Sequence, residues 1–150
     1  MSRLADYLYA VAIMLWVGAL WAIGFISAPV LFLHTGNVVL AGTLAGYQFA
    51  IVAWLGMGCA VYTLLFLFFR EGLQAFKQAA LWLVVIMLLL TIAGHFGVTP
   101  IVERLRMESA RELVQGVVSS RFQTWHGIAS VLWLLESILG VALVTQVVKR

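Results

Sequence analysis

The sequence predicts an all-α integral membrane protein, a four-helix bundle with an amphipathic interfacial helix between the third and fourth spans. Of the 150 residues, 64% are hydrophobic and 10% are charged, whereas soluble proteins are about 45–50% apolar and about 25% charged. The mean hydropathy is +1.07. Four separate stretches reach the roughly 20 apolar residues that a helix needs to cross a bilayer. These observations exclude a water-soluble enzyme and predict a single transmembrane domain over residues 1–150.

The four spans are expected over about residues 7–32, 47–69, 78–99 and 122–148. The last three end at charged residues or at a proline, where an apolar helix leaves the bilayer or stops. The first stretch is too long for the apolar region of a signal peptide, which has about 7–15 residues. We therefore expect it to be retained as the first span.

The segment between the third and fourth spans is polar and is expected to form a helix over about residues 100–118. Thr99 is suited to cap this helix, and Pro100 suits its first position, where no N–H donor is needed. Glu103 and Arg106 form an opposite-charge pair three residues apart. Apolar residues recur at helical spacing further along. The pattern predicts an amphipathic helix on the membrane surface, with a lid over the bundle as the alternative.

The charges predict the partners and the orientation. Nine Lys and Arg against six Asp and Glu give a net charge of +3, but they form no stripe, so no nucleic-acid partner is expected. Four spans place both termini and the 70–77 turn on one side, with five basic residues against four on the other. The positive-inside rule then predicts cytoplasmic termini for a multi-pass protein in the lipid bilayer.

Cys59 is the one cysteine, so a disulfide framework is excluded.

All three histidines are expected near the membrane face opposite the termini. His34 follows the first span, His95 lies about 7 Å before the end of the third, and His126 lies at a similar depth in the fourth. Neutral imidazole is the commonest metal ligand and the usual axial ligand of haem b. His95 and His126 are therefore predicted to bind haem b or copper, with His34 as a third metal contact. The alternative is that no cofactor is bound and the imidazoles form ordinary hydrogen bonds.

Polar side chains inside the spans are expected to face a shared interior, because lipid offers them no hydrogen bonds. Glu136 is the one formally charged side chain deep inside a span, where a carboxylate costs about 2.5–3.5 kcal/mol on insertion scales. It is expected to hydrogen-bond a backbone carbonyl, Thr63 or Thr91. A bundle-stabilising hydrogen bond, a proton relay or ligand contact, and a dimer contact are the roles considered. The predicted polar interior consists of Glu136, Ser130, Thr91 and Gln48.

Small residues recur at four-residue spacing in the spans. Such pairs let helix backbones approach closely in lipid, which favours bundle packing, a homo-oligomer or a larger membrane complex. The pairs are Gly18 and Ala22, Gly24 and Ala28, Gly42 and Gly46, and Gly56 and Ala60.

Motifs of soluble enzymes are missing. There is no Ser/His/Asp group at one depth, no glycine-rich phosphate loop, and no HExxH, CxxC or CxxCH sequence. No hydrolase or transferase is indicated, and a membrane-bound redox protein is the enzyme class that stays open.

Four sequence segments carry a family resemblance: LWVGALWAIGFISAPVLF (residues 15–32), AGTLAGYQFAIVAWLG (41–56), GHFGVTPIVERLR (94–106) and RFQTWHGIASVLWLLES (121–137). Over nearly its whole length the chain resembles a bacterial four-helix family catalogued as domain of unknown function 4149, whose eukaryotic relatives include transmembrane protein 205. The resemblance implies a four-span protein of the bacterial inner membrane whose biochemical role is unsettled.

More remotely, the Trp-Val-Gly motif of the first span is similar to the superfamily of copper-resistance protein D. That superfamily also contains the haem-binding, membrane-bound protoporphyrinogen oxidase of bacteria, so the resemblance implies redox-metal chemistry. Those relatives have a histidine about two turns before the first-span tryptophan, where this chain has Tyr9. A site would therefore be built from His95 and His126. The positions that match the family pattern are His126, Gly127, Trp16, Gly18, Pro29 and Phe32.

Three functions are expected, in this order. The first is a haem b- or copper-binding membrane protein for redox chemistry or metal handling. The second is an oligomeric transport or export component for a small solute or a metal, with Glu136 lining a polar path. The third is a structural or assembly subunit that docks through its small-residue faces onto a larger membrane complex.

Overall fold

The computed structural model describes residues 3–112 and 120–148. Within these ranges the chain is helical apart from short connections, and four helices are long and apolar enough to cross a membrane. The prediction of an all-α, four-span membrane protein is confirmed. The elements are α1 Arg3–Trp21, η1 Ala22–Ser27, α2 Ala28–His34, α3 Val38–Glu71, η2 Gly72–Lys77, α4 Ala79–Ile92, η3 Ala93–Val98, α5 Thr99–Glu112 and α6 Ser120–Val148.

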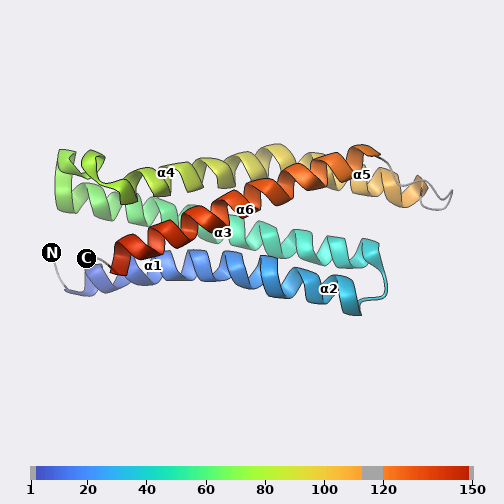
Figure 1. Ribbon diagram of the computed structural model, residues 1–150, viewed down its shortest axis with the longest axis horizontal. Helices are drawn as coiled ribbons and strands as arrows, with labels where there is room; N and C mark the ends of the chain where they lie inside the picture. The colour runs from blue at the N-terminus through green and yellow to red at the C-terminus, as the bar shows by residue number, and fades with distance from the viewer. Residues whose placement is uncertain (1–2, 113–119, 149–150) are drawn as a thin grey trace.

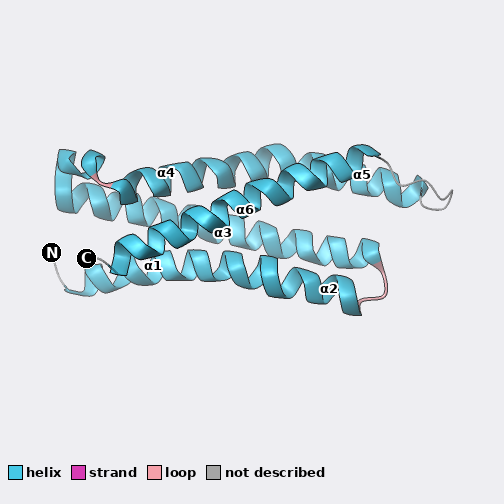
Figure 2. Cartoon of the chain, viewed as in Figure 1, coloured by secondary structure: helices cyan, strands magenta, loops and turns pink. Residues whose placement is uncertain are grey.

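The elements form four long rods side by side (Figures 1 and 2). The start of α1, the end of α6 and the short helix η2 lie together at one end, which we call the termini end; the opposite end is the connector end (Figure 1). Helix α6 runs obliquely across the bundle and packs against α1, α4 and α5. Its first turns lie beside α5, and its last turns lie beside α1 (Figure 1).

Two of the rods pass through a proline without breaking. A proline inside an α-helix removes a hydrogen bond, and its ring clashes with the carbonyl four residues earlier. Here each proline follows a π-helical segment by two residues: η1 precedes Pro29 and η3 precedes Pro100. The wider π-helical turn gives the ring room, so the helix continues.

Helix α3 starts at Val38, earlier than the predicted start near residue 47. Asn37 caps it: the Oδ1 atom of Asn37 accepts hydrogen bonds from the backbone N–H groups of Val39 and Leu40, at 3.0 and 3.1 Å. The helix ends at Gly72, whose φ of +55° is accessible to glycine at little cost. With 34 residues, α3 is about 51 Å long at ~1.5 Å per residue and extends beyond a ~30 Å hydrocarbon layer.

The amphipathic helix predicted for residues 100–118 is present as α5, and residues 113–119 lie outside the described part. Its direction differs from the expected one. It continues through η3 in line with α4 and does not turn across the end of the bundle (Figure 1). Val102 is buried, and the Arg106 side chain lies over Gly42 and Gly46 of α3. The physical reason is that η3 accommodates Pro100, so no bend redirects the chain.

Tryptophan side chains occupy the space that two glycines leave open. The indole of Trp16, on α1, lies where a Cβ atom on Gly56 of α3 would be, and the indole of Trp133, on α6, lies against Gly24 in the same way. These glycines therefore receive a large side chain from a neighbouring helix. Gly18, in contrast, is exposed and has no atom within 4 Å of an added Cβ atom.

Candidate functional site

Glu136 lies inside the bundle and is held by a second helix. It is 7% exposed and lies 12 residues before the end of α6, about 18 Å along the helix axis. The hydroxyl Oγ1 of Thr91, on α4, is 2.5 Å from Oε1 of Glu136. Thr91 is itself 6% exposed. Of the polar residues predicted for the interior, Glu136 and Thr91 are the two that the structure brings together.

The Thr91 hydroxyl has two oxygen neighbours but one proton to donate. Its second neighbour is the backbone carbonyl oxygen of Met87, one turn earlier on α4, at 2.9 Å. When Glu136 is a carboxylate, Thr91 donates to it. When Glu136 carries a proton, the carboxyl group donates to Thr91, and Thr91 donates to Met87. The carboxyl group of Glu136 is therefore hydrogen-bonded to Thr91 in either protonation state, and the Met87 carbonyl takes the Thr91 proton only when Glu136 carries its own.

Further buried polar atoms near Glu136 have no hydrogen-bond partner. Ser137 Oγ and Trp133 Nε1 are on α6 with it, one residue after it and three residues before it. The backbone carbonyl of Ser137 accepts a hydrogen bond from Trp21 Nε1 at 3.4 Å. Trp16 Nε1 and Thr63 Oγ1 are also buried without a partner. Lipid supplies no hydrogen bonds, so these atoms are polar groups of the interior that the described side chains leave unsatisfied.

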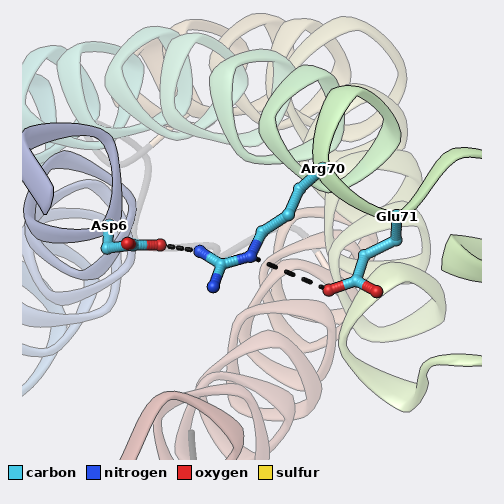
Figure 3. Close-up of polar contacts among 3 residues, drawn as sticks. All are labelled: Asp6, Arg70 and Glu71. Carbon is cyan, nitrogen blue, oxygen red and sulfur yellow. Dashed lines mark ion pairs between the residues drawn. The ribbon is translucent and has the colours of Figure 1, made fainter. Parts of the chain in front are cut away.

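No cation neutralises Glu136 among the ion pairs of the described residues. Those pairs lie at the termini end, where Arg70 pairs with Asp6 and its Nε atom is 3.9 Å from Oε1 of Glu71 (Figure 3). None of these three residues was among the predicted site residues. The sequence pattern that could have indicated this ion pair is that Asp6 and Arg70 each lie at the termini end of an apolar span.

The three histidines have separate surroundings. His95 is half-buried, and its ring is 5.6 Å from the ring of Trp54 and 4.8 Å from that of Phe96. His126 is exposed and stacks on Phe122 of its own helix, with ring centroids 5.7 Å apart. His34 is exposed too, and its Nδ1 atom is 3.1 Å from the backbone carbonyl oxygen of its own helix at position 30.

These surroundings bear on the predicted haem or copper site. No group of three or more His, Cys, Asp or Glu side chains within the described ranges forms a metal-binding cluster. The contacts described for His95 and His126 are with different aromatic rings and not with each other. We therefore assign no reaction to haem or copper at this site. Cofactor binding by His95 and His126 stays a prediction.

Gln48 and Ser130 complete the set of predicted polar residues. Gln48 is half-buried and accepts a hydrogen bond from Ser27 at 2.8 Å, which joins α3 to η1 near the connector end. Ser130 is exposed and donates to the backbone carbonyl of His126 on its own helix at 2.9 Å. Gln48 therefore links two helices, whereas Ser130 bonds within one.

Comparison with known protein families gives a match to this chain. The family described as Domain of unknown function (DUF4149) matches residues 11–111, more than half of the chain. The matched range includes Thr91 and His95, and it ends before α6 and Glu136. No curated protein and no solved structure matches the chain.

Proposed function

The chain belongs to the DUF4149 family, a family of unknown function, and on that premise we propose that it is a membrane transport component in which Glu136 takes up and releases a proton. The observation that carries this proposal is the hydrogen bond between Glu136 and Thr91, which joins a buried carboxyl group on α6 to a neutral hydroxyl on α4. Ionisable groups inside membrane helices mark proton relays and ion pathways.

The surroundings of Glu136 support a proton relay better than a purely structural contact. A structural hydrogen bond needs one fixed donor and one fixed acceptor. Here the Thr91 hydroxyl also reaches the Met87 carbonyl, so the carboxyl group keeps a partner whether or not it carries its proton. The unpartnered Ser137 Oγ and Trp133 Nε1 atoms supply further hydrogen-bonding positions for water along α6.

The proposal includes a homo-oligomer, because four helices alone form a thin wall around a polar path. Gly18 supports this part of the proposal. It is exposed on α1, an added Cβ atom there would touch nothing within 4 Å, and Ala22 is exposed four residues later. This pair is open for close approach by a helix of a second copy.

A flux measurement tests the proposal. Purified protein is reconstituted into liposomes that contain a pH-sensitive dye, and a potassium gradient with valinomycin sets the membrane potential. We expect wild-type protein to increase proton entry over empty liposomes and Glu136→Gln to abolish the increase, because an amide cannot carry the proton. Thr145→Val is the matched control: Thr145 is exposed on the same helix and donates to the carbonyl of Ala142. Equal proton entry in wild-type, Glu136→Gln and empty liposomes would contradict the proposal.

A second candidate function is the predicted haem b or copper protein, with His95 and His126 as the ligands. One observation favours it: His95 lies on the π-helical segment η3, and π-helical turns are frequent at functional sites. When bound, haem or copper would supply one-electron redox chemistry at the connector end of the bundle.

Absorbance spectra of the oxidised and reduced protein, together with elemental metal analysis, test this second candidate. The protein is purified in mild detergent from cells supplied with copper and a haem precursor. A Soret band or nearly stoichiometric copper that disappears in His95→Ala and His126→Ala is the expected result. Full cofactor content in the double variant would exclude these two residues as ligands.

A further inference from the structure

Glu136 lies at the boundary between two halves of the bundle that are packed differently. On α6, no side chain between positions 121 and 135 is buried, and Glu136 is the first buried residue on the way from the connector end. Thr91 is the last buried residue of α4, and the segments η1, α2 and η3 have no buried residue. The buried side chains described on the connector side of this boundary are Ala41, Ala45 and Val102. The half toward the connector end is therefore the more open one.

Apolar side chains close the bundle on the termini side of Glu136. Gly140 is one turn after Glu136 on α6, and an added Cβ atom there would be 3.1 Å from Val17 and 3.6 Å from Met87. We call this layer the apolar plug. Its side chains are buried and come from α1, α4 and α6: Ile13, Val17, Val84, Met87 and Leu143. They offer water no hydrogen bonds, and an apolar interior of this kind stays dry.

Two unpartnered polar atoms lie in the termini half, but they are isolated from each other. Trp16 Nε1 lies against Gly56 of α3, and Thr63 Oγ1 is on the same helix seven residues further along, about 10.5 Å along the axis. Cys59 and Ala60 lie between them and are buried. These two atoms therefore form no continuous polar line from the carboxyl group to the termini end.

Polar groups on the connector side follow one another at about one helical turn. Trp133 Nε1, one turn before Glu136 on α6, is buried without a hydrogen-bond partner. It lies against Gly24 of η1, 2.7 Å from the position of an added Cβ atom. Three residues further along η1, the Ser27 hydroxyl donates to Oε1 of Gln48 at 2.8 Å, and both side chains are half-buried. These groups lead from the carboxyl group into the more open half.

The oblique path of α6 produces the difference between the two halves. Its last turns lie beside α1, and its first turns lie beside α5 (Figure 1). Trp133 has the large side chain that still reaches η1 where α6 crosses the bundle. An indole N–H group only donates a hydrogen bond, whereas the Ser27 hydroxyl and the Gln48 amide each donate and accept. Such groups hold water molecules in place without taking up the proton themselves.

We propose that, in this conformation, Glu136 exchanges its proton with the connector side alone, through water molecules held by Trp133, Ser27 and Gln48. This inference rests on the proposed transport function and adds to it the side of access and two positioning residues, Ser27 and Gln48. On release, the O–H bond of the carboxyl group breaks and its proton passes to a neighbouring water molecule. That molecule gives one of its own protons to the next water molecule toward the connector end, and uptake is the reverse sequence.

Thiol labelling from each side of the membrane tests the side of access. Ser137→Cys, Met107→Cys and Lys77→Cys are each made in a Cys59→Ala background and treated with a charged, impermeant methanethiosulfonate reagent in membrane vesicles of both orientations. Met107 is exposed at the connector end, and Lys77 is exposed at the termini end. We expect position 137 to react from the side on which position 107 reacts. From the side of position 77 it should react at least about tenfold more slowly, because the apolar plug does not admit a charged reagent.

Substitutions of the two positioning residues test the water path. Gln48→Leu removes the amide and should slow the reaction at position 137 at least about tenfold, because the reagent loses its hydrated route, while the reaction at position 107 is unchanged. Ser27→Ala should slow it as well, which keeps the test decisive if Gln48→Leu does not fold. Gln48→Asn keeps an amide and should retain most of the rate. Gln123→Leu, the same change at an exposed position near the start of α6, should leave the rate unchanged.

The outcomes separate this inference from the proposed function, because labelling does not depend on proton flux. Reaction at position 137 from the termini side, or equally from both sides, would overturn the inference, and the proposed function would stand if Glu136→Gln still abolishes proton entry. An unchanged rate in Gln48→Leu and Ser27→Ala, or the same slow rate in Gln48→Leu and Gln48→Asn, would remove these residues from the path. One-sided reaction without proton entry would support the access path and contradict the transport function. Equally slow reaction from both sides would contradict both.

Discussion

At the residue scale, the proposed proton transfer depends on two side chains, Glu136 and Thr91. They join α6 to α4 by a 2.5 Å hydrogen bond in the membrane interior. Hydrogen bonds between membrane helices contribute about 0.6 kcal/mol on average, because the unfolded chain also finds partners in lipid. The contact is thus a modest source of stability. Its larger consequence is that it gives the buried carboxyl group a hydrogen-bond partner, which lipid does not supply.

Removal of the Thr91 hydroxyl is therefore expected to have a small effect on stability. Thr91→Val keeps the shape of the side chain and should lower the free energy of unfolding by about 0.6 kcal/mol, with about 1.7 kcal/mol as the upper limit. The free energy of unfolding is measured by titrating the protein with sodium dodecyl sulfate in mixed micelles. Thr145→Val, at an exposed position on α6, should lower the free energy of unfolding by less than Thr91→Val does. A loss several times larger than the upper limit would mean that Thr91 also supports the packing of α4.

The contact between Trp16 and Gly56 gives a second prediction at this scale. An added methyl group at Gly56 meets the Trp16 indole, so Gly56→Ala should destabilise the protein by about 1–3 kcal/mol through overpacking. Gly58→Ala, two residues further along α3, adds its methyl group where no atom lies within 4 Å. The same micelle unfolding experiment compares the two variants. Equal stability of both would contradict the packing of Trp16 against α3.

The sequence alone was enough to select Glu136, because a charged residue deep in an apolar span is costly wherever it points. It also reduced the expected side-chain partners to Thr63 and Thr91. It did not decide between them, because that choice depends on how α3 and α4 are rotated about their axes. The histidines show the same limit: spacing along the chain gives the depth of His95 and His126, and depth does not say which helix face they occupy.

At the element scale, the two π-helical segments decide how far the rods extend. η1 and η3 let the chain pass Pro29 and Pro100 in a helical conformation. Each π-helical turn also shifts the residues that follow it around the helix axis. Thr91, His95 and Thr99 are four residues apart from one to the next, and for this reason they are not equally buried: Thr91 is buried, and the other two are half-buried. The predicted first span already included Pro29, but the third span was predicted to end at Pro100, so the continuation through Pro100 was not predicted.

The direction of α5 is the testable consequence. In a Cys59→Ala background, the cysteine pair Gly42→Cys and Arg106→Cys should be joined by a short bismaleimide linker, because the Arg106 side chain lies 3.5 Å from a Cβ atom at position 42. The control pair is Gly42→Cys with Met107→Cys, whose side chain is 73% exposed and points elsewhere. Gel mobility after crosslinking in membranes measures the yield. A helix lying flat on the membrane would give both pairs the same low yield.

At the scale of the whole molecule, the bundle is a membrane-spanning unit with two polar ends and one polar centre. The number of spans and the shared end of both chain termini follow from four apolar stretches, and the sequence predicts both. The oblique path of α6 could not be predicted, since it results from how large side chains such as Trp133 fit beside Gly24. That path buries Glu136 and Ser137 and leaves His126 and Ser130 exposed. Cytoplasmic termini stay a prediction from the charge balance.

The central claim is that the interior around Glu136 exchanges with water, and a thiol-accessibility measurement tests it most directly. Ser137→Cys places a thiol of nearly the same size beside Glu136, at a position that is 3% exposed. Cys59, which lies in the apolar core, is the built-in reference. Reaction with a small, charged methanethiosulfonate reagent in liposomes should be at least about tenfold faster at position 137 in a Cys59→Ala background than at Cys59 in the wild-type protein, because polar atoms there stabilise water. Equally slow reaction at both positions would mean that no water reaches Glu136, and the proposed proton transfer would be contradicted.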